Sequence, residues 1–193
     1  MIRHRLLILA LCLSAACRST EPELYDIYRG TLEELAGAKG MSTEARTNNA
    51  KRHKRVRKWL AEGRIVSAQD HLYAAGALST SDEMTDLELA RDLATRADEL
   101  GESLGRVLVA ETTDKILVQQ GQEQRYGTQL YLDLPTKLWH MYPFDPMTTE
   151  GERTRMGLPS LAEMLRRVEE RNQQSDVTNA VIDAIGDRPE QDQ

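Results

Sequence analysis

The stretch LELARDLATRADEL (residues 87–100) places apolar or small residues three or four positions apart. This spacing puts them on one face of an α-helix. Gly101 follows directly, and glycine commonly ends a helix. The stretch therefore predicts an amphipathic helix that packs against other helices through one face. The positions on that face are Leu87, Ala90, Leu93, Ala94, Ala97 and Leu100.

The same helical period continues on both sides, whereas no convincing two-residue alternation of a β-strand appears. Ser67-Ala68-Gln69-Asp70 resembles a capping box, in which a serine and an acidic residue three positions later start a helix. Thr80-Ser81-Asp82 is typical of a turn and cap before the helix at 87–100. The other predicted helices cover about residues 23–36, 43–61, 67–78, 103–120, 159–172 and 176–185.

Residues 121–133 and 135–149 are predicted to be irregular, because three prolines in the second segment block a long helix. Short connections between successive helices favour antiparallel pairs. The predicted fold class is therefore all-α, with antiparallel helical hairpins in an irregular bundle and a long loop containing Pro and Gly before the C-terminal helices. We expect one helical domain over residues 24–186 and a disordered tail at 187–193.

The overall composition agrees with a helical fold. Of the 193 residues, 40% are apolar, 29% are charged and 5% are aromatic. So few aromatic and β-branched residues argue against a β-sandwich or barrel, and the abundant Ala, Leu, Glu, Arg and Gln favour helices. A formal net charge of −6 argues against a nucleic-acid partner.

Residues 1–16 have the pattern of an export signal. Arg3 and Arg5 supply the positive start, residues 6–13 are an unbroken apolar run, and residues 14–16 are small. The apolar run is too short for a membrane-spanning helix, which needs about 20 residues. The segment is therefore a predicted signal peptide and not part of the fold.

Cys17 would be the only cysteine of the exported chain, because Cys12 lies within the predicted signal peptide. No internal disulfide is then possible, and a lone cysteine in an exported chain needs a reason. The segment Leu13–Cys17 resembles the lipobox of bacterial lipoproteins, although its apolar residue lies one place earlier than usual. The resemblance implies acylation of Cys17. Residues 17–23 are predicted to form a short tether before the first helix.

The lipobox resemblance also implies a location. A lipid-anchored chain with Arg18 in place of an aspartate is expected at the periplasmic face of the outer membrane, with the membrane as its first partner. The alternative is ordinary cleavage after Ala16, which would leave a periplasmic or secreted chain. The basic stretch 51–58 fits a contact with lipid head groups or an acidic partner, or a solvated helix face. We favour the solvated face, because no aromatic residues are interleaved before Trp59.

Residues 59–168 resemble a family of bacterial proteins known as DUF6624. The run QRYGTQ (Gln124, Arg125, Tyr126, Gly127, Thr128 and Gln129) is its most specific segment. The remaining similarity lies at residues 59–64, 90–101, Asp114, 145–146, Arg153 and 157–163. The family has no established activity, so the resemblance implies a helical fold and a set of candidate residues. Residues 89–108 also resemble a single Sel1-type helical repeat, of the kind that pairs as in TPR proteins.

This sequence departs from the family pattern at three places. Related chains commonly carry histidine where Tyr73 stands and Gln-His-Gly where residues 79–81 stand. They also tend to have arginine where Lys115 follows Asp114. If those histidines are catalytic in the relatives, this chain has lost them, which favours a function without catalysis.

Asp114 is the most informative single position. It shares a predicted helix face with Val107, Ala110 and Leu117. A carboxylate on an apolar face needs a partner, because burying an unpaired charge is unfavourable. The guanidinium of Arg125, just beyond the helix, is its predicted bidentate partner.

The QRYGTQ run is predicted to form a polar plug beside Asp114. Gly127 would allow a backbone conformation that is closed to other residues. The side chains of Gln124, Thr128 and Gln129 would satisfy backbone groups where the chain leaves the helix. Tyr126 would bury its ring and keep its hydroxyl bonded. The same residues also fit a ligand pocket, so a structural and a binding role both stay open.

No catalytic or metal motif is recognisable, and no cofactor is expected. Glu111 and Asp114 form a carboxylate pair without a supporting histidine. His71 is predicted to be a partly exposed helix residue, and His140 is predicted to pack beside aromatic residues. Asp145 is predicted to cap the turn before residue 147 and to pair with Arg153.

Two functions follow from these observations. The first is a non-enzymatic helical binding module of the bacterial cell envelope, with another envelope protein as its partner. The alternative is a hydrolase-like or small-ligand enzyme built on Asp114 and the QRYGTQ run. A cleft that joins these residues to His71 or His140 would favour the enzyme. A filled core at that place, with a separate apolar groove, would favour the binding module.

Overall fold

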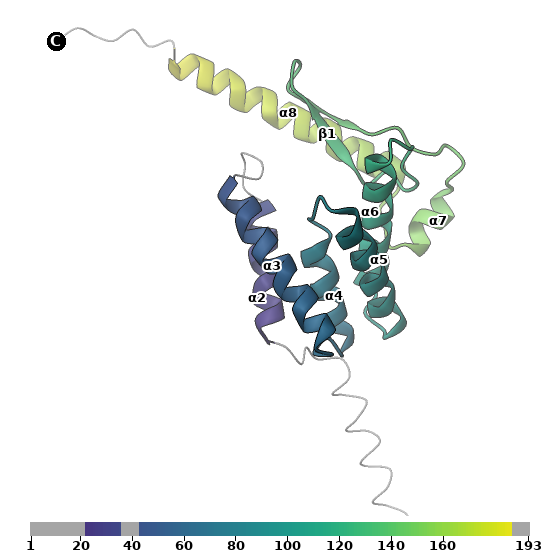
Figure 1. The fold of residues 1–193 in the computed structure, drawn as a ribbon. Helices are drawn as coiled ribbons and strands as arrows, with labels where there is room; N and C mark the ends of the chain where they lie inside the picture. Colours follow the sequence, from purple (N-terminus) through teal and green to yellow (C-terminus); the bar gives the residue numbers. More distant parts are fainter. Residues whose placement is uncertain (1–21, 36–42, 187–193) are drawn as a thin grey trace, which may run out of the picture.

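The structure of the chain is a computed structural model in which residues 22–35 and 43–186 are described. The predicted signal peptide, Cys17 and the predicted tail at 187–193 lie outside the described residues. Most of the described chain is helical, which confirms the all-α class (Figure 1). The elements are α2 (Pro22–Leu35), α3 (Thr43–Ala61), α4 (Ala68–Leu78), α5 (Met84–Glu99), α6 (Leu104–Gln119), β1 (Leu130–Asp133), β2 (Leu138–Met141), α7 (Glu150–Arg155) and α8 (Leu161–Gly186).

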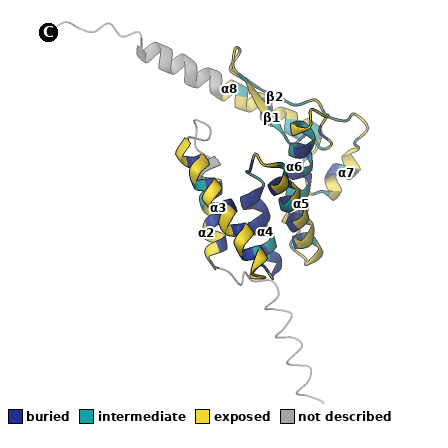
Figure 2. Cartoon of the chain, in the orientation of Figure 1, coloured by how far each residue is buried: buried dark blue, intermediate teal, exposed yellow. Residues whose placement is uncertain are grey.

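Helix α4 lies at the centre of the bundle and contacts α2, α3, α5 and α6. Ala74, Ala75 and Ala77 are fully buried, and these small side chains let the neighbouring helices approach closely. Figure 2 shows α4 buried over most of its surface, while the outer face of α3 is exposed. The buried core around α4 consists of Leu24, Ile27, Val56, Trp59, Ile65, Leu78, Ala90, Leu93 and Ala94, besides the three alanines.

Helix α5 contacts both α4 and α6. The amphipathic helix predicted at 87–100 is confirmed. Five of its six predicted face residues are buried, and only Leu100, at the helix end, is partly exposed. Gly105 at the start of α6 explains the close packing of α6 on α5. A Cβ atom at this position would lie 2.4 Å from the carbonyl oxygen of Ala94.

The start of α4 confirms the predicted capping box. The backbone N–H of Asp70 donates to Ser67 Oγ at 3.1 Å, and the backbone N–H of Ser67 donates to the Asp70 carboxylate at 2.9 Å. The start of α5 differs from the prediction, because the N-cap position is Glu83 and no side chain caps it. Ser81 accepts a hydrogen bond from the Glu83 N–H at 3.2 Å and donates one to Asp86 at 2.8 Å.

The prediction that residues 121–149 are entirely irregular is wrong. Strands β1 and β2 pair antiparallel, with Leu130 opposite Met141 and Asp133 opposite Leu138. Each strand has four residues, which is too short for a two-residue alternation to be visible in the sequence. Tyr131 and Trp139 are residues that favour strands, and they belong to this hairpin.

The C-terminal region and the tether also differ from the prediction. One continuous helix, α8, replaces the two helices predicted at 159–172 and 176–185, since neither Gly nor Pro interrupts residues 173–175. Helix α2 begins at Pro22, which suits a first helical turn, so the predicted tether over 17–23 is at least two residues too long. No helix within 22–35 or 43–186 has the length and apolar character required to cross a bilayer.

Candidate functional site

Asp114 lies on α6, is fully buried and accepts four hydrogen bonds. Its Oδ1 atom accepts from the backbone N–H groups of Arg125 at 2.7 Å and Tyr126 at 2.8 Å. Its Oδ2 atom accepts from the backbone N–H of Thr128 at 2.9 Å and from the Thr128 hydroxyl at 2.8 Å. The QRYGTQ loop (residues 124–129) therefore surrounds the Asp114 carboxylate. Three backbone N–H groups and one hydroxyl of the loop supply all four hydrogen bonds.

The predicted pairing of Asp114 with the Arg125 guanidinium is wrong. The guanidinium of Arg125 is half-exposed and donates to the carboxylate of Glu152 at 3.0 Å. It also lies over the Tyr126 ring, 5.4 Å from the ring centroid. Backbone N–H groups bind the carboxylate instead, because the amides of this loop lie outside regular secondary structure and need acceptors.

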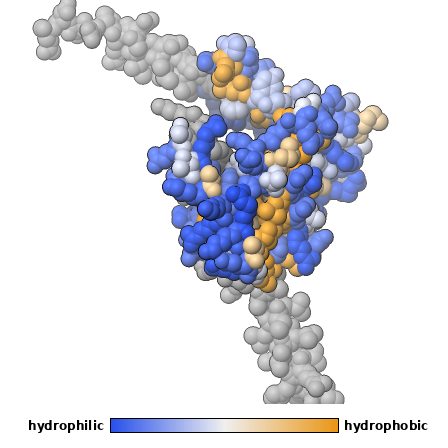
Figure 3. Space-filling view, viewed as in Figure 1, coloured by the Kyte–Doolittle hydropathy of each residue, from blue (hydrophilic) through white to orange (hydrophobic). Residues whose placement is uncertain are grey.

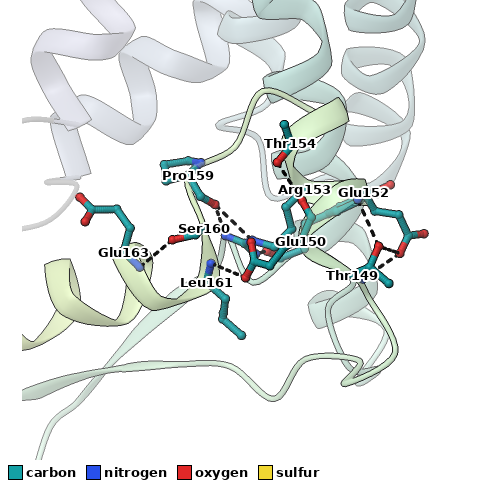
Figure 4. Close-up of polar contacts among 10 residues, drawn as sticks. Thr149, Glu150, Glu152, Arg153, Thr154, Pro159, Ser160, Leu161 and Glu163 are labelled. Atoms are coloured by element: carbon teal, nitrogen blue, oxygen red, sulfur yellow. Dashed lines mark hydrogen bonds and ion pairs between the residues drawn. The ribbon is translucent and has the colours of Figure 1, made fainter.

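Arg153 contacts both the QRYGTQ loop and the segment before α8. Figure 4 shows its hydrogen bonds to Pro159. Only 3% of Arg153 is exposed. Its Nη1 atom donates to the Tyr126 carbonyl, and its Nε and Nη2 atoms donate to the Pro159 carbonyl at 3.2 and 2.9 Å. Burial lowers the pKa of Arg153, and the charges of Glu150 and Asp114 oppose this change. Arg153 thus joins the loop to the segment that precedes α8, and it does not pair with Asp145 as predicted.

Gln124 closes the loop through its side-chain amide. Its Nε2 atom donates to the carbonyl groups of Gln129 at 3.2 Å and Tyr142 at 2.8 Å, and its Oε1 atom accepts from the Gln129 N–H at 2.7 Å. The residue is fully buried. The prediction that this side chain satisfies backbone groups is confirmed, and the same is true of Gln129, whose amide donates to the Glu111 carbonyl at 3.1 Å.

The other predictions for the loop have mixed outcomes. Gly127 has φ +70°, the left-handed conformation that favours glycine, as predicted. Thr128 bonds the Asp114 carboxylate through its hydroxyl and not a backbone group, which differs from the prediction. The Tyr126 ring is half-buried and not buried, because it lies under the Arg125 guanidinium near the surface.

The predicted histidine partners do not join this loop. His71 donates a hydrogen bond from its Nδ1 atom to the Ser67 carbonyl at 2.7 Å, at the start of α4. His140 stacks on Tyr131 in the hairpin at 5.5 Å, as predicted. Asp145 accepts from the Met147 N–H at 2.8 Å, so the predicted turn cap is confirmed. No group of three or more potential metal-ligating residues occurs in the described part of the chain.

A buried polar cluster that the sequence did not reveal surrounds His53 on α3. His53 Nε2 lies 3.1 Å from the Thr80 hydroxyl, and its Nδ1 atom lies 3.8 Å from the Asp86 carboxylate. Arg57 also donates to Asp86. Burial lowers the pKa of His53 more than Asp86 raises it. The partners lie 27 and 33 residues further along the chain, so no local spacing could have indicated them.

A separate apolar groove lies between α2, α4 and α6, with a volume of about 290 Å³. We call it the α2–α4–α6 groove. Figure 3 shows that apolar atoms also reach the surface in a strip between two hydrophilic areas. The groove is lined by Tyr28, Leu32, Leu72, Gly76, Ser79, Leu104, Val107, Leu108 and Glu111.

A polar pocket of about 270 Å³ adjoins the groove and shares Ser79 and Glu111 with it. Lys115 donates to the Ser79 carbonyl at 3.0 Å inside this pocket. Burial lowers the pKa of Lys115, and the charge of Asp82 opposes the change. Thr128 and Gln129 of the QRYGTQ loop complete the wall. The apolar groove and the polar pocket are therefore adjacent on the surface of the bundle.

No family model matches the chain, and no curated protein or solved structure is detectably similar to it.

Proposed function

We propose that this chain is an exported, lipid-anchored helical binding protein of the bacterial cell envelope, and that the α2–α4–α6 groove holds its ligand. One observation carries the proposal. The place where the enzyme alternative would need a cleft is filled, because Asp114 is buried and accepts four hydrogen bonds from the QRYGTQ loop. A separate apolar groove lies beside it. A filled core with a separate groove is what a binding module requires.

Export and anchoring rest on the first 17 residues. Residues 1–16 carry the charge, apolar run and small residues of a signal peptide, and Cys17 follows them in a lipobox-like segment. A lipid anchor would hold the bundle at a membrane surface, where a groove for an envelope component is accessible.

The resemblance to the DUF6624 family supports the same region. Chains of that family commonly carry histidine at the position of Thr80 and tend to carry arginine at that of Lys115, and both positions line the polar pocket here. Thr128 and Gln129 from the QRYGTQ run lie in the same wall. Positions that the resemblance singles out are thus near one another in the fold, which supports a shared ligand-binding surface.

The hydrolase-like alternative is weakened by the same geometry. A general base needs an oxygen that can reach a substrate proton. Each oxygen of Asp114 already accepts two hydrogen bonds. His71 and His140, the other candidate bases, make their contacts elsewhere in the fold. We therefore propose that the hydrogen bonds between Asp114 and the QRYGTQ loop are structural, while Thr128 and Gln129 of that loop also line the polar pocket.

The experiment has two arms. Intact-mass analysis of the chain extracted from membranes is expected to show acyl mass on Cys17, and the Cys17→Ser chain is expected to leave the membrane fraction. For the groove, crosslinking in envelopes compares the wild-type chain with Leu104→Glu, since Leu104 is exposed at the groove rim. Leu165→Glu, on exposed α8 outside the groove, is the matched control.

Loss of one specific crosslinked species in Leu104→Glu, with retention in Leu165→Glu, would support the proposal. Identical crosslinking patterns for both variants and the wild-type chain would show that the groove binds no envelope component. An unmodified cysteine in the membrane-extracted chain would refute the anchor.

A further inference from the structure

The chemistry of the α2–α4–α6 groove is asymmetric. Its floor and walls are aliphatic or aromatic, formed by Leu72, Leu104, Val107 and Leu108 together with Tyr28. Glu111 is the only charged residue among the nine that line it. A ligand that fits such a groove has an apolar body, and its polar group must complement a carboxylate.

Tyr28 is held in the groove by the absence of a side chain on Gly76. A Cβ atom at Gly76 would lie 2.4 Å from Cε2 of the Tyr28 ring, so only glycine allows this position of the ring. Tyr73 stacks on Tyr28 with centroids 5.3 Å apart, and Tyr25 packs on Tyr73 at 5.4 Å. The faces of aromatic rings are negative and attract cations. The three tyrosine rings therefore favour a positively charged ligand group, as the Glu111 carboxylate does.

Glu111 is in an unusual environment for a surface carboxylate. The residue is exposed, yet neighbouring atoms partly remove its carboxylate from water, and this desolvation together with the charge of Asp114 raises its pKa. Within residues 22–35 and 43–186 no cation counteracts the shift, since Lys115 at the next turn donates to the Ser79 carbonyl instead. A positive ligand group next to Glu111 would stabilise the ionised form of this carboxylate.

We infer that the α2–α4–α6 groove binds a small amphiphilic cation, with its aliphatic chain between Leu72, Leu104 and Leu108 and its ammonium group between the Tyr28 ring and Glu111. The inference rests on the proposed binding function and names the ligand class. The volume of about 290 Å³ lies at the lower limit of small-molecule sites, which suits a short chain.

The test uses three probes with the same hexyl chain and different head groups: hexyltrimethylammonium, hexanol and hexanoate. Binding to the mature chain carrying Cys17→Ser is measured by NMR titration at pH 7. Hexyltrimethylammonium is expected to bind about tenfold more tightly than hexanol, because one charge and one aromatic face contribute, and hexanoate is expected to bind most weakly. Added salt should weaken only the cation.

Glu111→Gln is expected to reduce affinity for the cation about fivefold to tenfold and to leave hexanol binding unchanged. Glu123→Gln, an exposed carboxylate in the loop after α6 and outside the groove, is the matched control. Tyr28→Phe keeps the ring face and should keep cation binding, whereas Tyr28→Leu should lower it.

The outcomes separate the two proposals. Hexanol or hexanoate binding as tightly as the cation, with chemical-shift changes at groove residues, would overturn the cation inference and keep the binding function. Absence of binding by all three probes would overturn the inference. The crosslinking experiment with Leu104→Glu would then test independently whether the groove binds an envelope component.

Discussion

The backbone N–H of Arg125 donates to the Asp114 carboxylate at 2.7 Å, while the guanidinium of the same Arg125 turns away to Glu152. Asp114 therefore binds the main chain of Arg125, and the Arg125 side chain takes no part in this contact. The cation that fastens the loop is Arg153, which donates to the Tyr126 and Pro159 carbonyl groups. The two arginines thus have different expected contributions to stability.

Replacing Asp114 with Asn should destabilise the fold strongly. The amide has one oxygen where the carboxylate has two, so its NH₂ group must face backbone N–H groups that are themselves donors. We expect a loss of about 3 kcal/mol in the free energy of unfolding, as for a buried charge-assisted network that is broken. Urea unfolding measures this, with Glu123→Gln, an exposed residue between α6 and the QRYGTQ loop, as control. A loss equal to that of the control would contradict the central role of Asp114.

Arg125→Ala and Arg153→Ala should differ in effect. The exposed Arg125–Glu152 pair contributes at most about 1 kcal/mol. Removing the buried Arg153 leaves the Tyr126 and Pro159 carbonyl groups without their donors, and we expect a loss of about 2–4 kcal/mol. Arg153→Lys should recover only part of it, since one ammonium lacks the geometry of the guanidinium fork. Thermal unfolding of the three variants would refute this assignment if Arg125→Ala were the most damaging.

Gly127→Ala and Gly121→Ala separate backbone strain from steric contact. Both glycines have positive φ, +70° and +71°, so alanine at either position is strained by about 1 kcal/mol. At Gly121 no atom lies within 4 Å of the new Cβ, whereas at Gly127 it would lie 3.2 Å from Arg153 Nη1 and from Met141 Sδ. Gly127→Ala should therefore lose more stability in urea unfolding. Equal losses would mean that the Arg153 contact is not tight.

How far the sequence predicts this molecule depends on the range of each interaction. The capping box of Ser67 and Asp70 was predictable, because both partners lie within one helical turn. The inward direction of Asp114 was predictable from the helical period. The direction of the Arg125 side chain was not, since Glu152 lies 27 residues away and the competing donors are backbone amides without a sequence signal.

Two kinds of feature were missed: strands that are too short to show a pattern, and contacts between residues that are far apart in the sequence. The strands of the β1–β2 hairpin are too short to show alternation. The cluster of His53, Thr80 and Asp86 joins three segments of the chain. The α2–α4–α6 groove depends on Gly76, whose missing side chain makes room for a ring from another helix. Glycine inside a predicted helix was the available signal for this close approach.

Glu111→Gln should stabilise the free protein at neutral pH. The pKa of Glu111 is raised in the fold, so its protonated form is favoured there and its ionised form is unfavourable. The unfavourable contribution is absent below the ordinary pKa of 4.5, grows as pH rises above it and is complete above the higher folded pKa. Unfolding at pH 7 and pH 4 should show a more stable variant only at pH 7. A variant less stable than wild type at pH 7 would contradict the desolvation of Glu111.

The buried His53 predicts how stability depends on acid. Burial lowers its pKa below the usual 6.5, further lowered by Arg57 and Lys115 and opposed by Asp86 and the Ala77 carbonyl. The unfolded chain then binds more protons than the folded chain below about pH 6.5. The free energy of unfolding should therefore fall as pH decreases from 7.5 to 5.5, by at most about 1.4 kcal/mol per pH unit from this group.

His53→Gln isolates that contribution. Glutamine keeps a donor for the Thr80 hydroxyl but cannot be protonated, so the variant should be less stable at pH 7.5 and should show a flatter pH dependence. His140→Gln, in the hairpin, leaves His53 in place and should retain the slope of the wild-type chain. Urea unfolding at intervals of half a pH unit measures both slopes. A slope that persists in His53→Gln would assign the acid sensitivity to another group, because the only titratable atom removed is the imidazole that Asp86 and Thr80 enclose.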